Sequence, residues 1–228
     1  PDHRHTFPRT GDHATVIDVT EATSLSVAHR HHDAGLRTVV LNFASPTVPG
    51  GGFLAGERAQ EEYHCRSTAL FACQAGGPMY SFHQHQANAL RSDAMIYSPD
   101  VPVFRGDDHQ LLEEPFKVAF LSAAACDARD VAPLDQPKIV GAMGARIVKV
   151  LAAAQANGHD ALVLGAWGCG NFANDPALIA DLFRQALQGP FKGAFRRVTF
   201  AIIDATSDQR CLNQFRLALS FQTPPGAN

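Results

Sequence analysis

The chain has 228 residues, enough for one large domain, and 46% of them are hydrophobic, enough for a sizeable core. Its formal net charge is -3 and it has no block of like charge, so it lacks the basic surface of a protein that reads nucleic-acid sequence. The five cysteines form no CxxC pair, which favours reduced thiols in a cytoplasmic protein. No apolar run approaches the ~18 residues that span a bilayer and no signal peptide opens the chain, so we expect no membrane contact.

The predicted elements alternate between strands and helices. Residues 1–13 are rich in His, Pro, Arg and Asp and predict a flexible lead-in, and residues 14–228 predict a single domain without an internal linker. Periodicity and turn residues then predict helices at 20–31, 59–75, 138–158, 176–189 and 208–220. The same signals predict strands at 37–45, 116–125, 160–167 and 196–204, two short strand pieces at 94–104 broken by prolines, and a polar excursion at 81–93. This order predicts an α/β fold with a central, largely parallel sheet.

Two glycine-rich loops follow predicted strands and precede predicted helices. The first contains Gly50, Gly51 and Gly52. The second has the sequence GCGNFAND at 168–175, and its glycines are Gly168 and Gly170, with Gly165 just before it. In such sheets the ligand lies beyond the carboxyl ends of the strands, where loop N–H groups can bind an anion. A diphosphate site and a pair of tight turns therefore remain alternatives. The GxGxxG and GxxxxGK[ST] patterns are absent, which argues against a dinucleotide dehydrogenase and a P-loop enzyme.

Two adjacent carboxylates, Glu61 and Glu62, stand near the start of the helix predicted at 59–75. Neighbours on a helix point about 100° apart, and the helix dipole favours negative charge there. The two carboxylates can therefore approach one ligand from two different directions. The alternative is a solvated acidic turn in which Glu62 pairs with Arg66 at i+4.

Other chemically reactive residues carry weaker signals. The eleven histidines include short clusters but no HExxH motif and no thiolate pair, so surface histidines are favoured over a zinc site. We expect no metal and no cofactor. Trp167 ends an apolar strand, which favours packing over ligand stacking. Cys169 has no evident histidine partner, which argues against a nucleophile. The histidine clusters are His3/His5, His29/His31/His32 and His83/His85.

The triple glycine, the seven residues after it and the QEE at 60–62 resemble the signature of poly(ADP-ribose) glycohydrolases. Further segments similar to the short bacterial-type branch of that family are VLNFASPTVPGGGFLAG, IYSPDVPVFR and LGAWGCGNFANDP. The resemblance runs from about Thr20 to the final helix. It implies a macrodomain-like catalytic domain, a three-layer α/β/α sandwich around a mixed, largely parallel sheet.

The resemblance also implies roles for single residues. Glu62 is implied as the catalytic acid, Glu61 and Asn42 as ligands of the distal ribose, and Phe172 as the residue that packs on that ribose. The glycine loops are implied to wrap the diphosphate, with Thr20 near the adenine. The complete set of implied substrate contacts is Thr20, Asn42, Gly50, Gly51, Gly52, Gln60, Gly168, Cys169, Gly170, Asn171 and Phe172.

The implied activity is hydrolysis of the ribose–ribose O-glycosidic bonds of poly(ADP-ribose), with Glu62 as general acid and base. The implied partners are poly(ADP-ribose), ADP-ribose and ADP-ribosylated proteins, and we expect a monomer. Three alternatives stay open at this point: a module that binds ADP-ribose without cutting it, a hydrolase of mono-ADP-ribosylated targets, and, more remotely, a metal-dependent phosphohydrolase.

Overall fold

A six-stranded sheet organises the chain, of which the computed structural model describes residues 8–86 and 88–220. The strand order is β1-β6-β5-β2-β4-β3, and β3 runs antiparallel to β4 while the other neighbours are parallel. The predicted mixed, largely parallel sheet is thus confirmed. The strands are β1 (Val16–Thr20), β2 (Thr38–Phe43), β3 (Met95–Arg105), β4 (Leu111–Ala123), β5 (Ala161–Leu164) and β6 (Arg197–Ala201).

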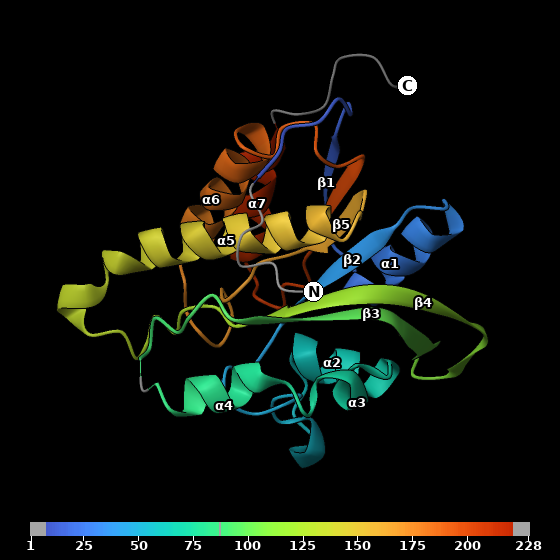
Figure 1. The fold of residues 1–228 in the computed structure, drawn as a ribbon, viewed down its shortest axis with the longest axis horizontal. Helices are drawn as coiled ribbons and strands as arrows, with labels where there is room; N and C mark the ends of the chain where they lie inside the picture. Colours follow the sequence, from blue (N-terminus) through green and yellow to red (C-terminus); the bar gives the residue numbers. More distant parts are fainter. Residues whose placement is uncertain (1–7, 87, 221–228) are drawn as a thin grey trace.

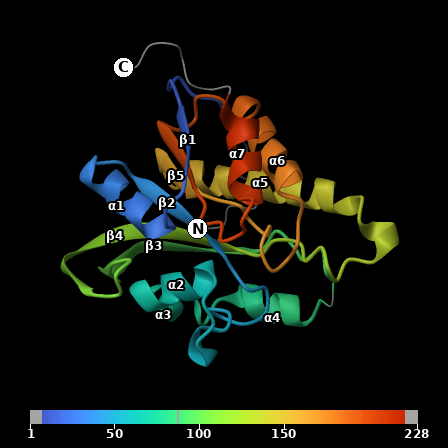
Figure 2. The same ribbon diagram turned by 180° about the vertical axis from the view of Figure 1, so that it is seen from behind.

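Helices cover both faces of this sheet (Figures 1 and 2). They are α1 (Ser24–Asp33), α2 (Gln60–Ser67), α3 (Leu70–Gln74), α4 (Pro78–Gln84), α5 (Lys138–Ala156), α6 (Pro176–Gln188) and α7 (Arg210–Leu219). Side chains alternate across a strand, so Val39 and Leu41 of β2 join the core under α5, α6 and α7. Val40 faces the other core, with Phe120 of β4 and Leu25 of α1. The apolar run of β2 is therefore explained by burial on both faces.

Helix α5 is long and apolar enough to cross a membrane by length and composition alone. Half of that stretch is buried inside the protein, and core helices pass the same test, so this is weak support for a membrane span. The sequence predicts no membrane span because Arg146 and Lys149 interrupt the apolar run within this continuous helix.

The sequence prediction was wrong for the strand pieces at 94–104, because β3 is one continuous strand. It lies at the edge of the sheet, where a proline that cannot donate a hydrogen bond is tolerated. The register shifts between Ser98 and Val101, and Asp100 in that bulge has a φ of 50°. The prolines thus produce a bulge and not a break.

The helix predicted at 59–75 is two helices, α2 and α3. Thr68 between them is extended, with φ -142° and ψ 171°, and it bridges to Val103 of β3. The Ala69 N–H donates to the Pro102 carbonyl at 3.0 Å. Pairing with the edge strand therefore interrupts a segment that contains no Gly or Pro. The sequence pattern also missed β1 and α4.

Residues 8–13 of the predicted lead-in pack against the rest of the chain. The Gly11 N–H donates to the Lys192 carbonyl at 2.9 Å, and the His13 N–H donates to the Gly193 carbonyl at 3.1 Å. Residues 1–7 lie outside the described residues. The domain boundary at residue 13 stays a prediction.

Candidate active site

The two adjacent carboxylates begin α2 and are both buried, with Glu61 3% and Glu62 5% exposed. They lie in the first turn of the helix, where the dipole favours negative charge. Arg66 does not pair with Glu62, because its Nη1 donates to the Glu57 carbonyl at 2.5 Å. The solvated acidic turn is therefore excluded, and the pair is an interior feature of the protein.

Glu61 accepts hydrogen bonds from three donors. Asn42 Nδ2 and Gln74 Nε2 donate to its Oε1 at 3.2 and 3.0 Å, and the Ser45 N–H donates to its Oε2 at 2.6 Å. Burial raises the pKa of Glu61 to about 7, and the nearby Glu62 adds to the rise, while the three donors oppose it. Both oxygens of Glu61 are thus held in place by protein groups.

Glu62 is held from one side only. Its Oε1 accepts from the Gly52 N–H at 2.8 Å, and its buried Oε2 has no hydrogen-bond partner in the described residues. Gly51 has a φ of +59°, and a Cβ there would lie 2.3 Å from Oε1 of Glu62 and 3.2 Å from Oε2 of Glu61. Only glycine leaves room for both carboxylates, so the two acids converge on one point although they are 100° neighbours on a helix.

Two glycine amides of the first loop form hydrogen bonds inside the protein. The Gly51 N–H donates to the Val48 carbonyl at 3.0 Å, and the Gly52 N–H is bound to Glu62. Gly50 allows close packing, since a Cβ there would lie 2.8 Å from the Phe71 ring. The structure therefore shows this loop as the holder of the carboxylates, and its contact with a diphosphate stays a prediction.

The second glycine loop presents unused amides. In the described part of the chain the backbone N–H groups of Gly168, Gly170, Asn171 and Phe172 have no hydrogen-bond partner. Gly170 and Asn171 are exposed, and the other two are half-buried. Successive free N–H groups in a turn form a concave site for an anion. The geometry supports the predicted diphosphate contact for this loop.

The second loop rests on the segment after β4. Asn174 Nδ2 donates to the Cys126 carbonyl at 2.8 Å and to the Gly168 carbonyl at 3.0 Å. The Ala128 N–H donates to the Phe172 carbonyl at 2.9 Å, and the Arg129 guanidinium lies 5.8 Å from the Phe172 ring centroid. These contacts fix the loop without using its free amides.

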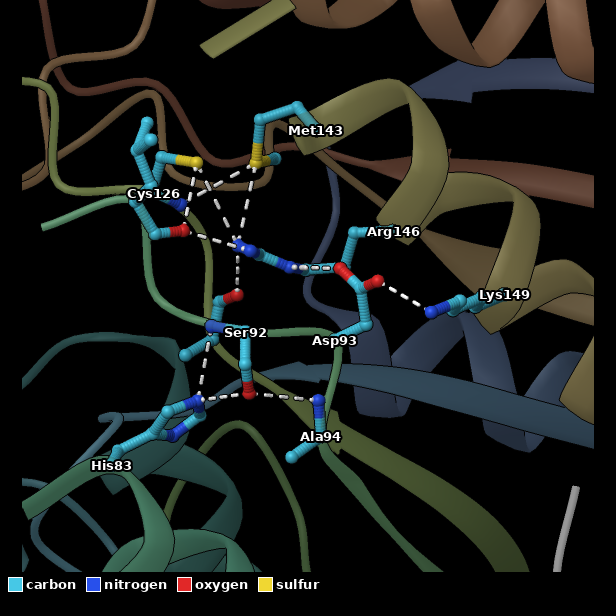
Figure 3. A network of polar contacts seen from close by, with 10 residues as sticks. His83, Ser92, Asp93, Ala94, Cys126, Met143, Arg146 and Lys149 are labelled. Carbon is cyan, nitrogen blue, oxygen red and sulfur yellow. Dashed lines mark hydrogen bonds and ion pairs between the residues drawn. The ribbon is translucent and has the colours of Figure 1, made fainter. Parts of the chain in front are cut away.

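A buried arginine supports that segment in turn (Figure 3). Arg146 of α5 is 1% exposed, and its Nη1 donates to the Ala124 carbonyl at 2.8 Å and contacts Cys126 Sγ at 3.7 Å. Its Nη2 donates to the Leu90 carbonyl at 2.8 Å, and its Nε lies 3.4 Å from Asp93 Oδ1. Arg146 therefore ties the end of β4 to the segment that precedes β3.

Four other residues predicted as substrate contacts lie within the fold, and hydrogen bonds to protein groups hold three of them. Asn42 is fully buried and bonds to Glu61, while Gln60 bonds to the Phe43 N–H at 2.8 Å and the Leu41 carbonyl at 3.1 Å. Thr20 ends β1, and its carbonyl accepts from the Ile202 N–H at 3.0 Å. Cys169 is half-buried, and burial raises the pKa of its thiol, which disfavours a nucleophile. Direct contacts of these four residues with substrate stay predictions.

The predicted packing of Trp167 is confirmed, because the side chain is fully buried in the core under α5, α6 and α7. The prediction of surface histidines was wrong for three of them, because His31, His64 and His83 are buried. His31 is buried against Thr199, and His83 is buried between the Pro46 carbonyl and Ser92. Within the described ranges, no group of three or more His, Cys, Asp or Glu side chains is placed to hold a metal ion.

The sequence reading missed three residues that surround the carboxylates: His64, Gln74 and Ser122. Ser122 Oγ donates to Gln74 Oε1 at 2.7 Å, and His64 Nδ1 lies 2.9 Å from Asn42 Oδ1. One signal was available, because Asn42 and Ser122 are single polar residues within apolar strand runs. Register pairs them across β2 and β4, on the face toward α2.

Comparisons with known proteins show the family of this chain. A family model described as microbial-type PARG, catalytic domain, matches residues 2–106, where PARG stands for poly(ADP-ribose) glycohydrolase. A solved poly(ADP-ribose) glycohydrolase from Deinococcus radiodurans, in complex with ADP-ribose, is 40% identical with a TM-score of 0.89, and the match covers 92% of this chain and 86% of that one. The chain belongs to the microbial-type poly(ADP-ribose) glycohydrolase family.

A second relative supports this membership. The poly(ADP-ribose) glycohydrolase from Thermomonospora curvata, bound to the inhibitor ADP-HPD, is 47% identical with a TM-score of 0.86, over 89% of this chain and 78% of that one. Among curated proteins, no match was found. The macrodomain-like fold and the family resemblance of the QEE segment are thus confirmed. In this chain, both glutamates of QEE are buried beside the first glycine loop.

Proposed function

We propose that this chain hydrolyses the ribose–ribose O-glycosidic bonds of poly(ADP-ribose) and that Glu62 is its general acid and base. The observation that carries the assignment is the buried, unpartnered Oε2 of Glu62. A buried polar atom without a partner destabilises the fold by about 1–3 kcal/mol, and Oε2 of Glu62 is the oxygen of the described carboxylate pair in that state. In the described part of the site, both oxygens of Glu61 face donors and Oε1 of Glu62 faces an N–H. Oε2 is left to exchange a proton with a substrate.

The chemistry follows from that oxygen. Cleavage of the bond between ribose C1″ and the O2′ of the next unit builds oxocarbenium character at C1″. Glu62, protonated at Oε2, gives its proton to the departing O2′, which leaves as a hydroxyl. The resulting carboxylate takes a proton from the water that adds to C1″. Each cycle therefore consumes one water and returns Glu62 to its starting state.

The rest of the site orients the substrate for this step. The free N–H groups of the second loop support binding of the diphosphate, and Phe172 beside them supports packing on the distal ribose. Glu61, fixed by its three donors, supports binding of the ribose hydroxyls. Relatives whose structures hold ADP-ribose or ADP-HPD support this ligand class.

The decisive experiment compares Glu62→Gln with Glu57→Gln, an exposed glutamate of the same loop. We expect Glu62→Gln to release ADP-ribose from protein-linked polymer about 10²–10⁴ times more slowly, because it cannot donate or accept the proton. Glu57→Gln should keep the wild-type rate. Calorimetric titration should show ADP-ribose binding to both variants. Normal release by a folded Glu62→Gln variant contradicts the assignment, and release only from singly modified protein assigns the chain to mono-ADP-ribose hydrolysis.

A further inference from the structure

The buried polar groups behind Glu61 form a connected set of hydrogen bonds. The Ser45 N–H can only donate, so Oε2 of Glu61 accepts. Asn42 Nδ2 has two hydrogens and donates one to Glu61 Oε1 and the other to Ser122 Oγ at 3.1 Å. Ser122 passes its hydrogen to Gln74 Oε1, and Gln74 Nε2 donates to Glu61. Every hydrogen in this ring points toward the carboxylate.

His64 ends the chain of hydrogen bonds on the far side of Asn42. Because Nδ2 of Asn42 faces Glu61, its Oδ1 faces His64 Nδ1 at 2.9 Å, and a carbonyl oxygen can only accept. Nδ1 of His64 must therefore carry a hydrogen. The Nε2 atom lies 2.5 Å from Ser24 Oγ, which can supply the hydrogen for a neutral ring. Burial lowers the pKa of His64 to about 3, so the ring stays neutral across the physiological range.

We propose that His64 is a positioning residue whose Nδ1–H fixes the amide orientation of Asn42 and thereby keeps an N–H donor directed at the ribose-binding carboxylate Glu61. The oxygen and nitrogen of an asparagine amide have nearly the same shape, so partners alone decide which of them faces Glu61. This assignment rests on the proposed function only for the role of Glu61. The orientation of the amide is independent of it.

The Nδ1–H of His64 is needed because Glu61 fixes the orientation of the Asn42 amide only while Glu61 is charged. With a pKa near 7, Glu61 is protonated in part of its population at neutral pH. A protonated carboxyl can donate to an amide oxygen as well as accept from an amide nitrogen. His64 removes the first option, since a turned amide would put its N–H₂ group against the Nδ1–H. The Glu61 side chain therefore faces the Nδ2–H of Asn42 whether it is charged or protonated.

The structural part of the proposal is tested by the tautomer of His64, measured at pH 8 by ¹⁵N NMR with the signal assigned from its loss in His64→Asn. Wild type should show the Nδ1–H form. In Asn42→Leu, the ring should change to the Nε2–H form, which Ser24 Oγ can accept. In the matched variant Ser24→Ala, the Nδ1–H form should persist. An Nε2–H or charged ring in wild type, or a change of tautomer in Ser24→Ala, overturns the proposal even where Asn42→Leu fails to fold.

The functional part is tested by His64→Leu, which has no donor, and His64→Asn, whose amide nitrogen can replace Nδ1. We expect kcat/KM on polymer to fall roughly 10-fold to 100-fold in His64→Leu, the range that corresponds to one lost buried hydrogen bond. The amide of His64→Asn should restore most of that loss at equal or lower thermal stability, which a purely structural role does not predict. Equal kcat/KM in the two variants overturns the positioning role. Failure of the proposed function is distinguishable, because it leaves the tautomer results unchanged.

Discussion

Replacing Gly51 by alanine tests whether this glycine holds Glu62 in place. The matched replacement of Gly56 measures the effect of backbone strain alone. The φ of Gly51 is +59°, and the added Cβ would lie 2.3 Å from Oε1 of Glu62, far inside any real contact distance. That oxygen accepts the 2.8 Å hydrogen bond from the Gly52 N–H, which must break when the carboxylate moves. Gly56 offers a matched control in the same loop, with a φ of +84° and no atom within 4 Å of an added Cβ.

Both alanine variants have the same backbone strain, but Gly51→Ala also loses a hydrogen bond. The left-handed backbone destabilises either alanine variant by roughly 1–2 kcal/mol. Gly51→Ala additionally loses a partly buried hydrogen bond to a carboxylate, worth about 1.5–3 kcal/mol. Because the side chain of Glu62 can rotate out of the clash, the fold should survive. Its acid is then displaced from the substrate, so the rate of polymer hydrolysis should fall by about 10²–10⁴.

Urea unfolding and a polymer-release assay measure both effects. Gly56→Ala should lose stability but keep at least half of the wild-type rate. Gly51→Ala should lose more stability and nearly all activity while ADP-ribose still binds in calorimetric titration. If Gly51→Ala hydrolyses polymer as fast as Gly56→Ala, Glu62 is not held in a catalytic position by this glycine, and the geometric reasoning fails.

Gly168→Ala puts a Cβ 2.6 Å from Asn174 Nδ2 at a φ of +75°, so it should weaken ADP-ribose binding in calorimetric titration, whereas Gly170→Ala, in open space, should not. In thermal melts, Arg146→Met removes a fully buried cation and should destabilise by about 2–4 kcal/mol, while Lys149→Ala at the exposed end of the same ion-pair group should lose under about 1 kcal/mol. Burial raises the pKa of Glu61 from 4.5 to about 7, so the folded state holds the extra proton between these pH values. The free energy of unfolding should therefore fall as pH rises through that window, by on the order of 3 kcal/mol, and Glu61→Gln should remove this fall in urea melts at pH 5 and pH 7.5.

Local patterns predicted most strands and helices because a core strand, buried on both faces, is apolar throughout and a helix buried on one side has apolar residues at helical spacing. The core strand β2 and the helices α5 and α6 are examples, within a few residues at each end. The pattern missed β1 because only one face of this edge strand packs under α7, and it joined α2 to α3 because the interruption at Thr68 comes from pairing with a distant strand. Tertiary pairing, which no local window contains, decided these cases.

In the candidate site too, some residues could be predicted from the local sequence and others only from tertiary contacts. The acids Glu61 and Glu62 were found because they are adjacent, charged and follow a triple glycine. Their supports His64, Gln74 and Ser122 were not, because each looks ordinary in its own helix or strand and becomes informative only when register brings it to Asn42. A lone polar residue inside an apolar strand is the sequence signal that such a network leaves, since an unpaired amide in a core destabilises the fold.

The two glycine loops differ in what their backbone does, and this difference predicts how their variants divide between binding and catalysis. The N–H groups of Gly51 and Gly52 are bound to protein atoms, one of them an oxygen of Glu62, so that loop fixes the place of the acid that we propose as the proton donor. Among the residues that the structure describes, the N–H groups of Gly168 and Gly170 have no hydrogen-bond partner, so the proposed function assigns the substrate anion to the second loop. An interaction equal in the ground and transition states changes KM, whereas one that acts only on the transition state changes kcat. Substitutions that move the first loop should thus lower kcat, and those that obstruct the second should raise KM. A first-loop variant that raises only KM contradicts this division, because it shows that the loop binds substrate directly.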